Sequence, residues 1–85
     1  MAHYSIETKP SFDRAFDRLP GEVQRRVTAC IELLADTPRP FGCKKLTGEA
    51  LYRARVGSYR IVYEIRDAVL LIVVVKVGHR REVYR

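Results

Sequence analysis

The sequence feature that most constrains the fold is the stretch LYRARVGSYRIVYEI, residues 51–65. Within it, two runs that alternate between polar and apolar residues flank the pair Gly57-Ser58. A two-residue link that contains glycine, between runs rich in β-branched and aromatic side chains, predicts a β-hairpin. If this pair forms the turn, Arg55 lies opposite Arg60 across the hairpin. The chain is therefore expected to fold back on itself at Gly57.

The predicted hairpin has two unlike faces, because side chains alternate along a strand. The apolar face carries Tyr52, Ala54, Val56, Tyr59, Ile61 and Tyr63, and the other carries Arg53, Arg55 and Arg60. Like charges placed opposite each other on a sheet cost roughly a few tenths of a kcal/mol. A polyanion lying across this face would compensate, because guanidinium groups bind phosphate oxygens through two hydrogen bonds. A solvated cationic face that keeps the sheet soluble is the alternative interpretation.

The length and charge of the chain limit the number of domains and the kinds of partner that it can have. Its 85 residues predict one domain spanning residues 1–85, with a core just large enough for independent folding. A net charge of +6 favours an anionic partner, with nucleic acid as the first candidate and a membrane surface or an acidic protein as the others. Polar residues interrupt the start of the chain, and no apolar run approaches the length of a membrane-spanning helix. We therefore expect a cytoplasmic protein.

The two cysteines agree with that compartment. Cys30 falls on an apolar helical stripe and Cys43 in a loop, which is typical of reduced thiols rather than of a secreted disulfide framework. Neither has a cysteine or histidine neighbour at a metal-ligand spacing, and the histidines, His3 and His79, lie far apart in sequence. We expect no metal and no cofactor.

Two helices are predicted ahead of the hairpin. Apolar residues recur at helical spacing in SFDRAFDRL, which follows Pro10, and again from Val23 to Leu34. Thr8 and Ser11 are candidate caps of the first helix. Proline and glycine separate the two segments, so they are expected to form an antiparallel helical hairpin. A weak alternation before the first helix, residues 3–7, indicates a short strand.

Two further segments complete the predicted domain. Residues 39–49 have the composition of an irregular loop, whose Lys44 and Lys45 either extend the basic surface or are simply solvated. After a turn at residues 67–68, the unbroken apolar run 69–75 predicts a strand covered on both faces. We expect it to be the central strand of an antiparallel sheet with the helices on one side.

The order of these elements, together with the run KKLTG-x-x-LYRARVG-x-YRIVYEI and the terminal VGHRREVY, resembles the RelE/ParE superfamily of toxins from bacterial and archaeal toxin–antitoxin pairs. The resemblance is to the RelE branch and covers essentially the whole chain. It implies an α+β fold, in which two N-terminal helices pack on a small, twisted, mainly antiparallel β-sheet. It also implies a ribosome-dependent, metal-independent endoribonuclease that cleaves mRNA in the A site by attack of a ribose 2′-hydroxyl on the adjacent phosphate. The partners implied are the ribosome, mRNA and a cognate antitoxin in a hetero-oligomer.

The resemblance also implies the positions of the functional residues. The two basic residues on the first hairpin strand of the family fall on Arg53 and Arg55, and the arginine of its G-x-YR motif falls on Arg60. The C-terminal arginine after the V-G pair falls on Arg80, and the tyrosine near the end on Tyr84. The family commonly has lysine where this chain has Arg53 and Arg55, so the most easily deprotonated amines are missing.

The residue types can be compared with the chemistry of such a cleavage. It needs a base, positive charge for the phosphorane oxygens and an acid. Arg55 and Arg60 fit the second role, and Arg80 fits an electrostatic clamp because arginine stays protonated. His79 is a candidate acid or base, with a reference pKa of about 6.5, or else a solvated loop histidine. Tyr84 can act as a general base only if cations lower its pKa from about 10. Otherwise its ring is a stacking platform for a nucleobase of the RNA.

Two other functions remain open. One is a ParE-like toxin that poisons DNA gyrase without cutting nucleic acid, and the other is a non-catalytic RNA-binding module. The clustering of basic residues favours the nuclease, because gyrase poisoning gives no reason for such a constellation. Lys44, Lys45 and Arg81 are predicted to bind RNA rather than to take part in catalysis.

Overall fold

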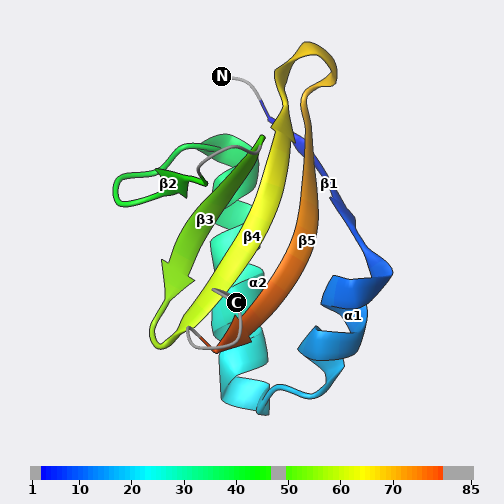
Figure 1. Cartoon of the computed structure of the whole chain (residues 1–85), viewed down its shortest axis with the longest axis vertical. Helices are drawn as coiled ribbons and strands as arrows, with labels where there is room; N and C mark the ends of the chain where they lie inside the picture. Colours follow the sequence, from blue (N-terminus) through cyan, green and yellow to red (C-terminus); the bar gives the residue numbers. More distant parts are fainter. Residues whose placement is uncertain (1–2, 47–49, 80–85) are drawn as a thin grey trace.

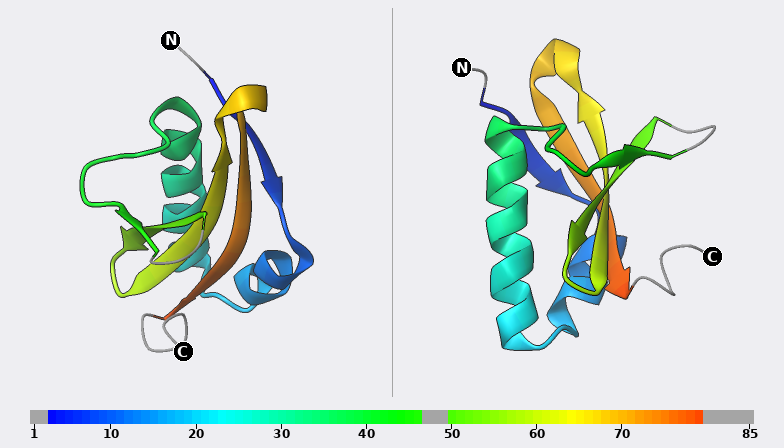
Figure 2. Two further views of the ribbon diagram at one scale, coloured as in Figure 1. Left: turned by 45° about the horizontal axis from the view of Figure 1, so that its top comes forward. Right: turned by 90° about the vertical axis from the view of Figure 1, so that its left-hand side faces the viewer.

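The computed structural model describes residues 3–46 and 50–79, which form an α+β domain with two helices packed on a five-stranded sheet (Figure 1). The elements in chain order are β1 (Ser5–Thr8), α1 (Pro10–Asp17), α2 (Gly21–Asp36), β2 (Lys44–Lys45), β3 (Leu51–Val56), β4 (Tyr59–Arg66), a 3-10 turn (Asp67–Val69) and β5 (Leu71–His79). The long helix α2 stands against one side of the sheet, and α1 packs beside β5 (Figure 2). The predicted fold class is confirmed.

The sheet has the strand order β1-β5-β4-β3-β2. All neighbouring strands are antiparallel except β1 and β5, which are parallel. The middle strand is therefore β4, and the prediction that the apolar run 69–75 would be central to an antiparallel sheet is wrong. Because β1 pairs with the outer side of β5, the strand that contains the apolar run lies next to the middle strand rather than in the middle of the sheet. It also begins later, at Leu71, since Val69 belongs to the 3-10 turn.

The predicted hairpin and its register are confirmed. β3 and β4 pair with Val56 opposite Tyr59 and Arg55 opposite Arg60. Gly57 has a φ of +59°, a left-handed conformation that glycine adopts without steric cost. A side chain at this position would also meet α2, because a Cβ there would lie 3.0 Å from Nη2 of Arg26. The turn is thus fitted closely against the helix.

The helices begin and end close to the predicted positions, but the predicted caps are wrong. Pro10 occupies the first turn of α1, where its missing N–H costs nothing. The N-cap residue is Lys9, without a side-chain capping hydrogen bond. The hydroxyl of Ser11 instead donates to the carbonyl oxygen of Val75 at 2.8 Å, which ties α1 to β5.

The core lies between α2 and the sheet side that faces it. The fully buried apolar side chains come from α2, β4 and β5 and include Val27, Leu34, Ile61, Tyr63, Ile72 and Val74. The opposite side of the sheet, turned away from α2, is called the open face below. On it Val62 and Val73 are each 4% exposed, so β5 is covered on both sides at Val73, as predicted. In the described part of the chain, no helix is both long enough and apolar enough to cross a membrane.

Candidate functional site

The hairpin strands place the predicted arginines together on the open face. Arg55 lies directly opposite Arg60, and Arg53 lies opposite Val62 on β4. On the other side of Arg53, β2 contributes Lys44, and beyond Val62 the strand β5 contributes Lys76. The open face therefore carries five cationic side chains from four strands in two neighbouring rows, with Arg55 and Arg60 in one row and Lys44, Arg53 and Lys76 in the other. Lys44 and Lys45 lie in a short strand, so the prediction that residues 39–49 form only an irregular loop is wrong.

The five cations differ in exposure. Arg53 is 8% exposed and Arg60 is 5% exposed, whereas Arg55, Lys44 and Lys76 are exposed. The alternative interpretation, a solvated cationic face, is therefore wrong for Arg53 and Arg60. Their position explains the difference, because each has a paired strand on both sides, while Arg55 lies on the outer edge of β3 beyond the end of β2. A long side chain between two neighbours is shielded by their backbone and side chains.

His79 lies on the other side of the sheet from these cations. Its neighbour Gly78 pairs with Arg60, so the alternation of side chains directs His79 toward the helices. Its ring meets the ring of Tyr59 edge-on, with 5.8 Å between centroids. Together with Arg18 and Pro20 the two rings line a pocket of about 320 Å³ at the end of α1. The strand pairing therefore places His79 on the side of the sheet opposite to Arg55 and Arg60.

Three predicted functional residues, Arg80, Arg81 and Tyr84, lie outside the residues that the structure describes. Lys45 is described and exposed, and it pairs with Tyr52. Because Lys44 and Lys45 are adjacent in a strand, they project to opposite sides of the sheet. Only Lys44 therefore adds to the open face.

A polar network that the sequence did not predict lies at the opposite end of the sheet from the turn at Gly57. The guanidinium of Arg39 donates to a carboxylate oxygen of Asp67 at 2.9 Å, and the hydroxyl of Tyr4 donates to the same carboxylate at 2.6 Å. Arg39 also lies over the ring of Tyr52, 5.2 Å from its centroid. The hydrogen bond from Arg39 is the main cause of a lowered pKa at Asp67. These partners are far apart in sequence, so no local pattern could have revealed them.

A second contact fastens the loop after α2 to the core. The buried hydroxyl of Tyr63 donates to the carbonyl oxygen of Pro38 at 2.7 Å. Burial is the main cause of a raised pKa at Tyr63. A tyrosine with a raised pKa on the helix-facing side is held protonated, so it serves structure rather than proton transfer.

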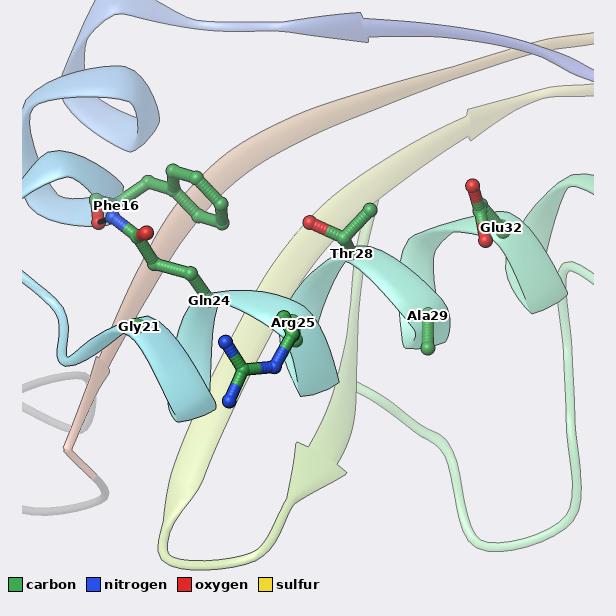
Figure 3. Close-up of a pocket in the computed structure, with 7 residues that line it drawn as sticks. All are labelled: Phe16, Gly21, Gln24, Arg25, Thr28, Ala29 and Glu32. Atoms are coloured by element: carbon green, nitrogen blue, oxygen red, sulfur yellow. Dashed lines mark hydrogen bonds between the residues drawn. The ribbon is translucent and has the colours of Figure 1, made fainter.

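An open pocket of about 390 Å³ lies on the side of the domain that faces away from the sheet, along α2 and next to α1. Figure 3 shows Arg25 and Glu32 on the same helix, with the ring of Phe16 entering from α1. The side chain of Gln24 donates to the carbonyl oxygen of Phe16 at 2.8 Å and joins the two helices. One cationic and one anionic side chain, Arg25 and Glu32, line this pocket, which lies on the other side of the sheet from Arg55. Within residues 3–46 and 50–79, no group of three or more histidine, cysteine, aspartate or glutamate side chains is gathered to hold a metal ion.

Comparison with known families gives a match over almost the whole chain. Residues 6–84 match the family described as the ParE toxin of the type II toxin–antitoxin system, parDE. A search of curated proteins found no match.

Comparison with solved structures gives toxins from toxin–antitoxin complexes. The archaeal RelE–RelB complex from Pyrococcus horikoshii contains a chain that is 30% identical, with a TM-score of 0.81, covering 94% of this chain and 97% of that one. The RelBE2 complex from Mycobacterium tuberculosis contains a chain with the same TM-score, 0.81, at 27% identity, covering 92% of this chain and 99% of that one. The E. coli RelBE complex, at 23% identity and a TM-score of 0.79 over 89% of this chain and 95% of that one, shows the same fold.

Proposed function

Because the chain belongs to the ParE toxin family of type II toxin–antitoxin systems, within the RelE/ParE superfamily, we propose that it is a toxin that acts as a ribosome-dependent endoribonuclease. The observation that carries the proposal is the pairing of Arg55 with Arg60 on the open face, next to a row that contains Lys44, Arg53 and Lys76. Two guanidinium groups directly opposite each other repel, so folding alone does not favour them. A bridging phosphate relieves that repulsion.

The proposed chemistry assigns different roles to the exposed and buried cations. Exposed Arg55 is free to approach a phosphate of the messenger and to stabilise the charge that develops on the phosphorane oxygens. Buried Arg60, next to it, adds positive potential in a region of low dielectric, where charges act more strongly. Lys44 and Lys76 are placed to hold neighbouring phosphates.

Proton transfer is assigned by family position rather than by contacts in the structure. Tyr84 and Arg80 are the proposed base and electrostatic clamp. His79 is a weaker candidate, because it lies on the helix-facing side beside Tyr59. With no strong general base among the described residues beside Arg55, the ribosome is expected to supply orientation, holding the 2′-hydroxyl in line with the scissile phosphate. Such orientation contributes several kcal/mol to lowering a barrier, up to about 7 to 11 in favourable cases.

The test compares programmed ribosomes with free messenger. The purified chain is incubated with ribosomes that carry an empty A site, and with the same mRNA alone, and cuts are mapped by primer extension. We expect cleavage within the A-site codon on ribosomes and a rate lower by orders of magnitude on free mRNA. Equal rates would make the protein a free ribonuclease, and no cleavage in either mixture would refute the nuclease proposal.

RNA binding has its own test in the dependence of affinity on salt. Each phosphate neutralised on a single strand contributes about 0.7 to the slope of log affinity against log salt concentration. Lys76→Ala should therefore lower that slope by about 0.7, because Lys76 is exposed on the open face. The control Arg14→Ala removes an exposed cation from α1 and should leave the slope unchanged.

A second candidate function is poisoning of DNA gyrase. The match of residues 6–84 to the family described for parDE favours it. A supercoiling assay with purified gyrase separates the two candidates. Accumulated cleaved DNA complexes together with intact mRNA on ribosomes would support the second function and exclude the first.

A further inference from the structure

Both cysteines of the chain line one pocket on the helix-facing side of the sheet, which we call the thiol pocket. It has a volume of about 330 Å³ and lies where α2, the loop after it and β3 meet. Figure 2 shows this loop crossing from the end of α2 to the edge of the sheet. Cys30 belongs to α2 and Cys43 to the end of the loop, and both are free and half-buried. Two nucleophilic sulfur atoms therefore share one cavity that a small oxidant can enter.

The strand that follows Cys43 directs its side chain toward α2. Lys44, the next residue, pairs with Arg53 and projects on the open face. Side chains of neighbouring residues in an extended chain project to opposite sides, so that of Cys43 points to the helix-facing side. Cys30 packs on that side against the core. The two thiols thus approach the pocket from the sheet edge and from the helix.

The hydroxyl of Tyr63 is a common neighbour of the two thiols. It donates to the carbonyl oxygen of Pro38 at 2.7 Å, which holds the loop after α2 against the core. Burial is the largest cause of the raised pKa of Tyr63, and the causes that follow are the thiols of Cys43 and then Cys30. Electrostatic interactions weaken with distance, so both sulfur atoms lie near this one oxygen.

We propose that Cys30 and Cys43 form a reversible disulfide bond when the protein meets a hydroperoxide, which makes the thiol pocket a redox-sensitive modification site. A disulfide needs Cα atoms about 4.4 to 6.8 Å apart. The loop has room to reach this spacing, because Gly42 has a φ of +90° and a Cβ there would meet nothing within 4 Å. The inference is independent of the nuclease proposal, since it uses none of the cations of the open face.

The reaction consumes one molecule of hydrogen peroxide for each pair of thiols. The thiolate of Cys43 attacks one peroxide oxygen, the O–O bond breaks and hydroxide leaves, which gives a sulfenic acid. The sulfur of Cys30 then attacks the sulfenic sulfur, the S–S bond forms and a second hydroxide leaves. The two protons lost by the thiols convert both hydroxides to water, so two electrons pass from sulfur to peroxide. Burial raises the pKa of the Cys30 thiol, which assigns Cys30 to the second attack.

The bridge would join α2 to the segment that enters β2. In a reducing compartment the free thiols are the resting form, and disulfides there are usually transient and redox-sensing. The bond closes residues 30–43 into a loop, which restricts the unfolded chain and thereby stabilises the folded one. The oxidised domain should therefore resist unfolding better than the reduced domain.

Mass spectrometry of the full-length chain tests whether the bond forms. The reduced protein is treated with hydrogen peroxide, remaining thiols are blocked with N-ethylmaleimide, and the intact mass should show the loss of two hydrogen atoms without any added label. Trypsin releases residues 27–44 as one peptide that holds both cysteines, and a second cleavage before Asp36 divides it. The two halves should stay joined until dithiothreitol is added.

Thermal unfolding and hydrogen exchange test what the bond does. The Tm of the oxidised wild type should exceed that of the reduced protein by about 10 °C. The amide of Cys43, which donates to the carbonyl oxygen of Pro40 at 3.1 Å, should exchange more slowly after oxidation. Cys30→Ala and Cys43→Ser each leave one thiol, so peroxide should cause neither change in these variants. Each variant is compared with its own reduced form, which removes any effect of the substitution on folding.

Several outcomes would overturn the proposal. One is a wild type that keeps two labelled thiols at a peroxide concentration that oxidises glutathione. Disulfide-linked dimers in place of the internal bond, or a sulfinic acid at one cysteine with the other thiol intact, would contradict it equally. An equal rise of Tm in Cys43→Ser would also refute it. None of these measurements needs ribosomes or RNA, so failure of the nuclease proposal leaves them unchanged.

Discussion

The cross-strand pair Arg55 and Arg60 allows activity and stability to be separated by two single substitutions. The residues face each other in the hairpin, but Arg55 is exposed and Arg60 is 5% exposed. Arg55→Ala removes a solvated side chain and one of two opposed like charges. Its effect on the free energy of unfolding should lie within about 0.5 kcal/mol of zero, with a small gain from the relieved repulsion.

Arg60→Ala differs because the side chain is buried. Removing it deletes packed methylene groups and a charge whose surroundings were shaped for it, and a loss of about 1 to 3 kcal/mol is expected. In a domain of this size each kcal/mol lowers Tm by about 4 to 8 °C. The melting temperature should therefore fall clearly for Arg60→Ala and hardly change for Arg55→Ala.

Both substitutions should reduce cleavage on programmed ribosomes. Losing one donor to a developing oxyanion typically costs about a hundredfold or more in rate. The rates are to be measured by primer extension at a temperature where urea titration shows each variant to be folded. Arg14→Ala, an exposed cation on α1, should cut at the wild-type rate. The reasoning fails if Arg55→Ala cuts as fast as wild type, or if it destabilises the domain as much as Arg60→Ala does.

Three further predictions follow from individual contacts. Tyr63→Phe should lower the free energy of unfolding by about 1 kcal/mol, with an unchanged slope in urea, because it removes the hydrogen bond to the loop carbonyl. Gly57→Ala should destabilise by about 1 to 2 kcal/mol, because φ is +59° and its Cβ would meet Arg26; adding Arg26→Ala should recover only the part due to that contact. Asp67→Asn should make the free energy of unfolding fall less steeply as the pH is lowered through the acid range. The folded-state pKa of Asp67 is depressed, mainly by Arg39, so its contribution is present above the unfolded value of about 3.9 and is lost as pH falls through the folded value. Urea midpoints across the acid range, compared with wild type, measure this difference.

Local sequence patterns determine the register of the hairpin and the positions of the two helices. The register of the hairpin was predictable because a two-residue turn at Gly57 fixes every pair along both strands. The helices were predictable because their apolar residues recur at helical spacing around breaks at proline and glycine. These features depend on residues that are close together in the chain.

The burial of the candidate site depended on tertiary structure. The sequence pattern does not distinguish the exposure of Arg53, Arg55 and Arg60. Of these three arginines only Arg55 is exposed, because β2 pairs beside Arg53 and β5 pairs beside Arg60. The side of the sheet taken by His79 likewise followed from the pairing of Gly78 with Arg60. The spacing of residues along the chain predicts neither the burial of these arginines nor the side of the sheet on which His79 lies.

The sequence by itself determined the two helices, the hairpin with its register and the cationic character of one sheet face. The tertiary structure alone decided the parallel pairing of β1 with β5 and the network of Arg39 with Asp67. The physical reason is the range of the interactions. Turn geometry and periodicity act over a few residues, whereas strand order, burial and side-chain contacts join segments tens of residues apart, whose approach is governed by the packing of the whole core.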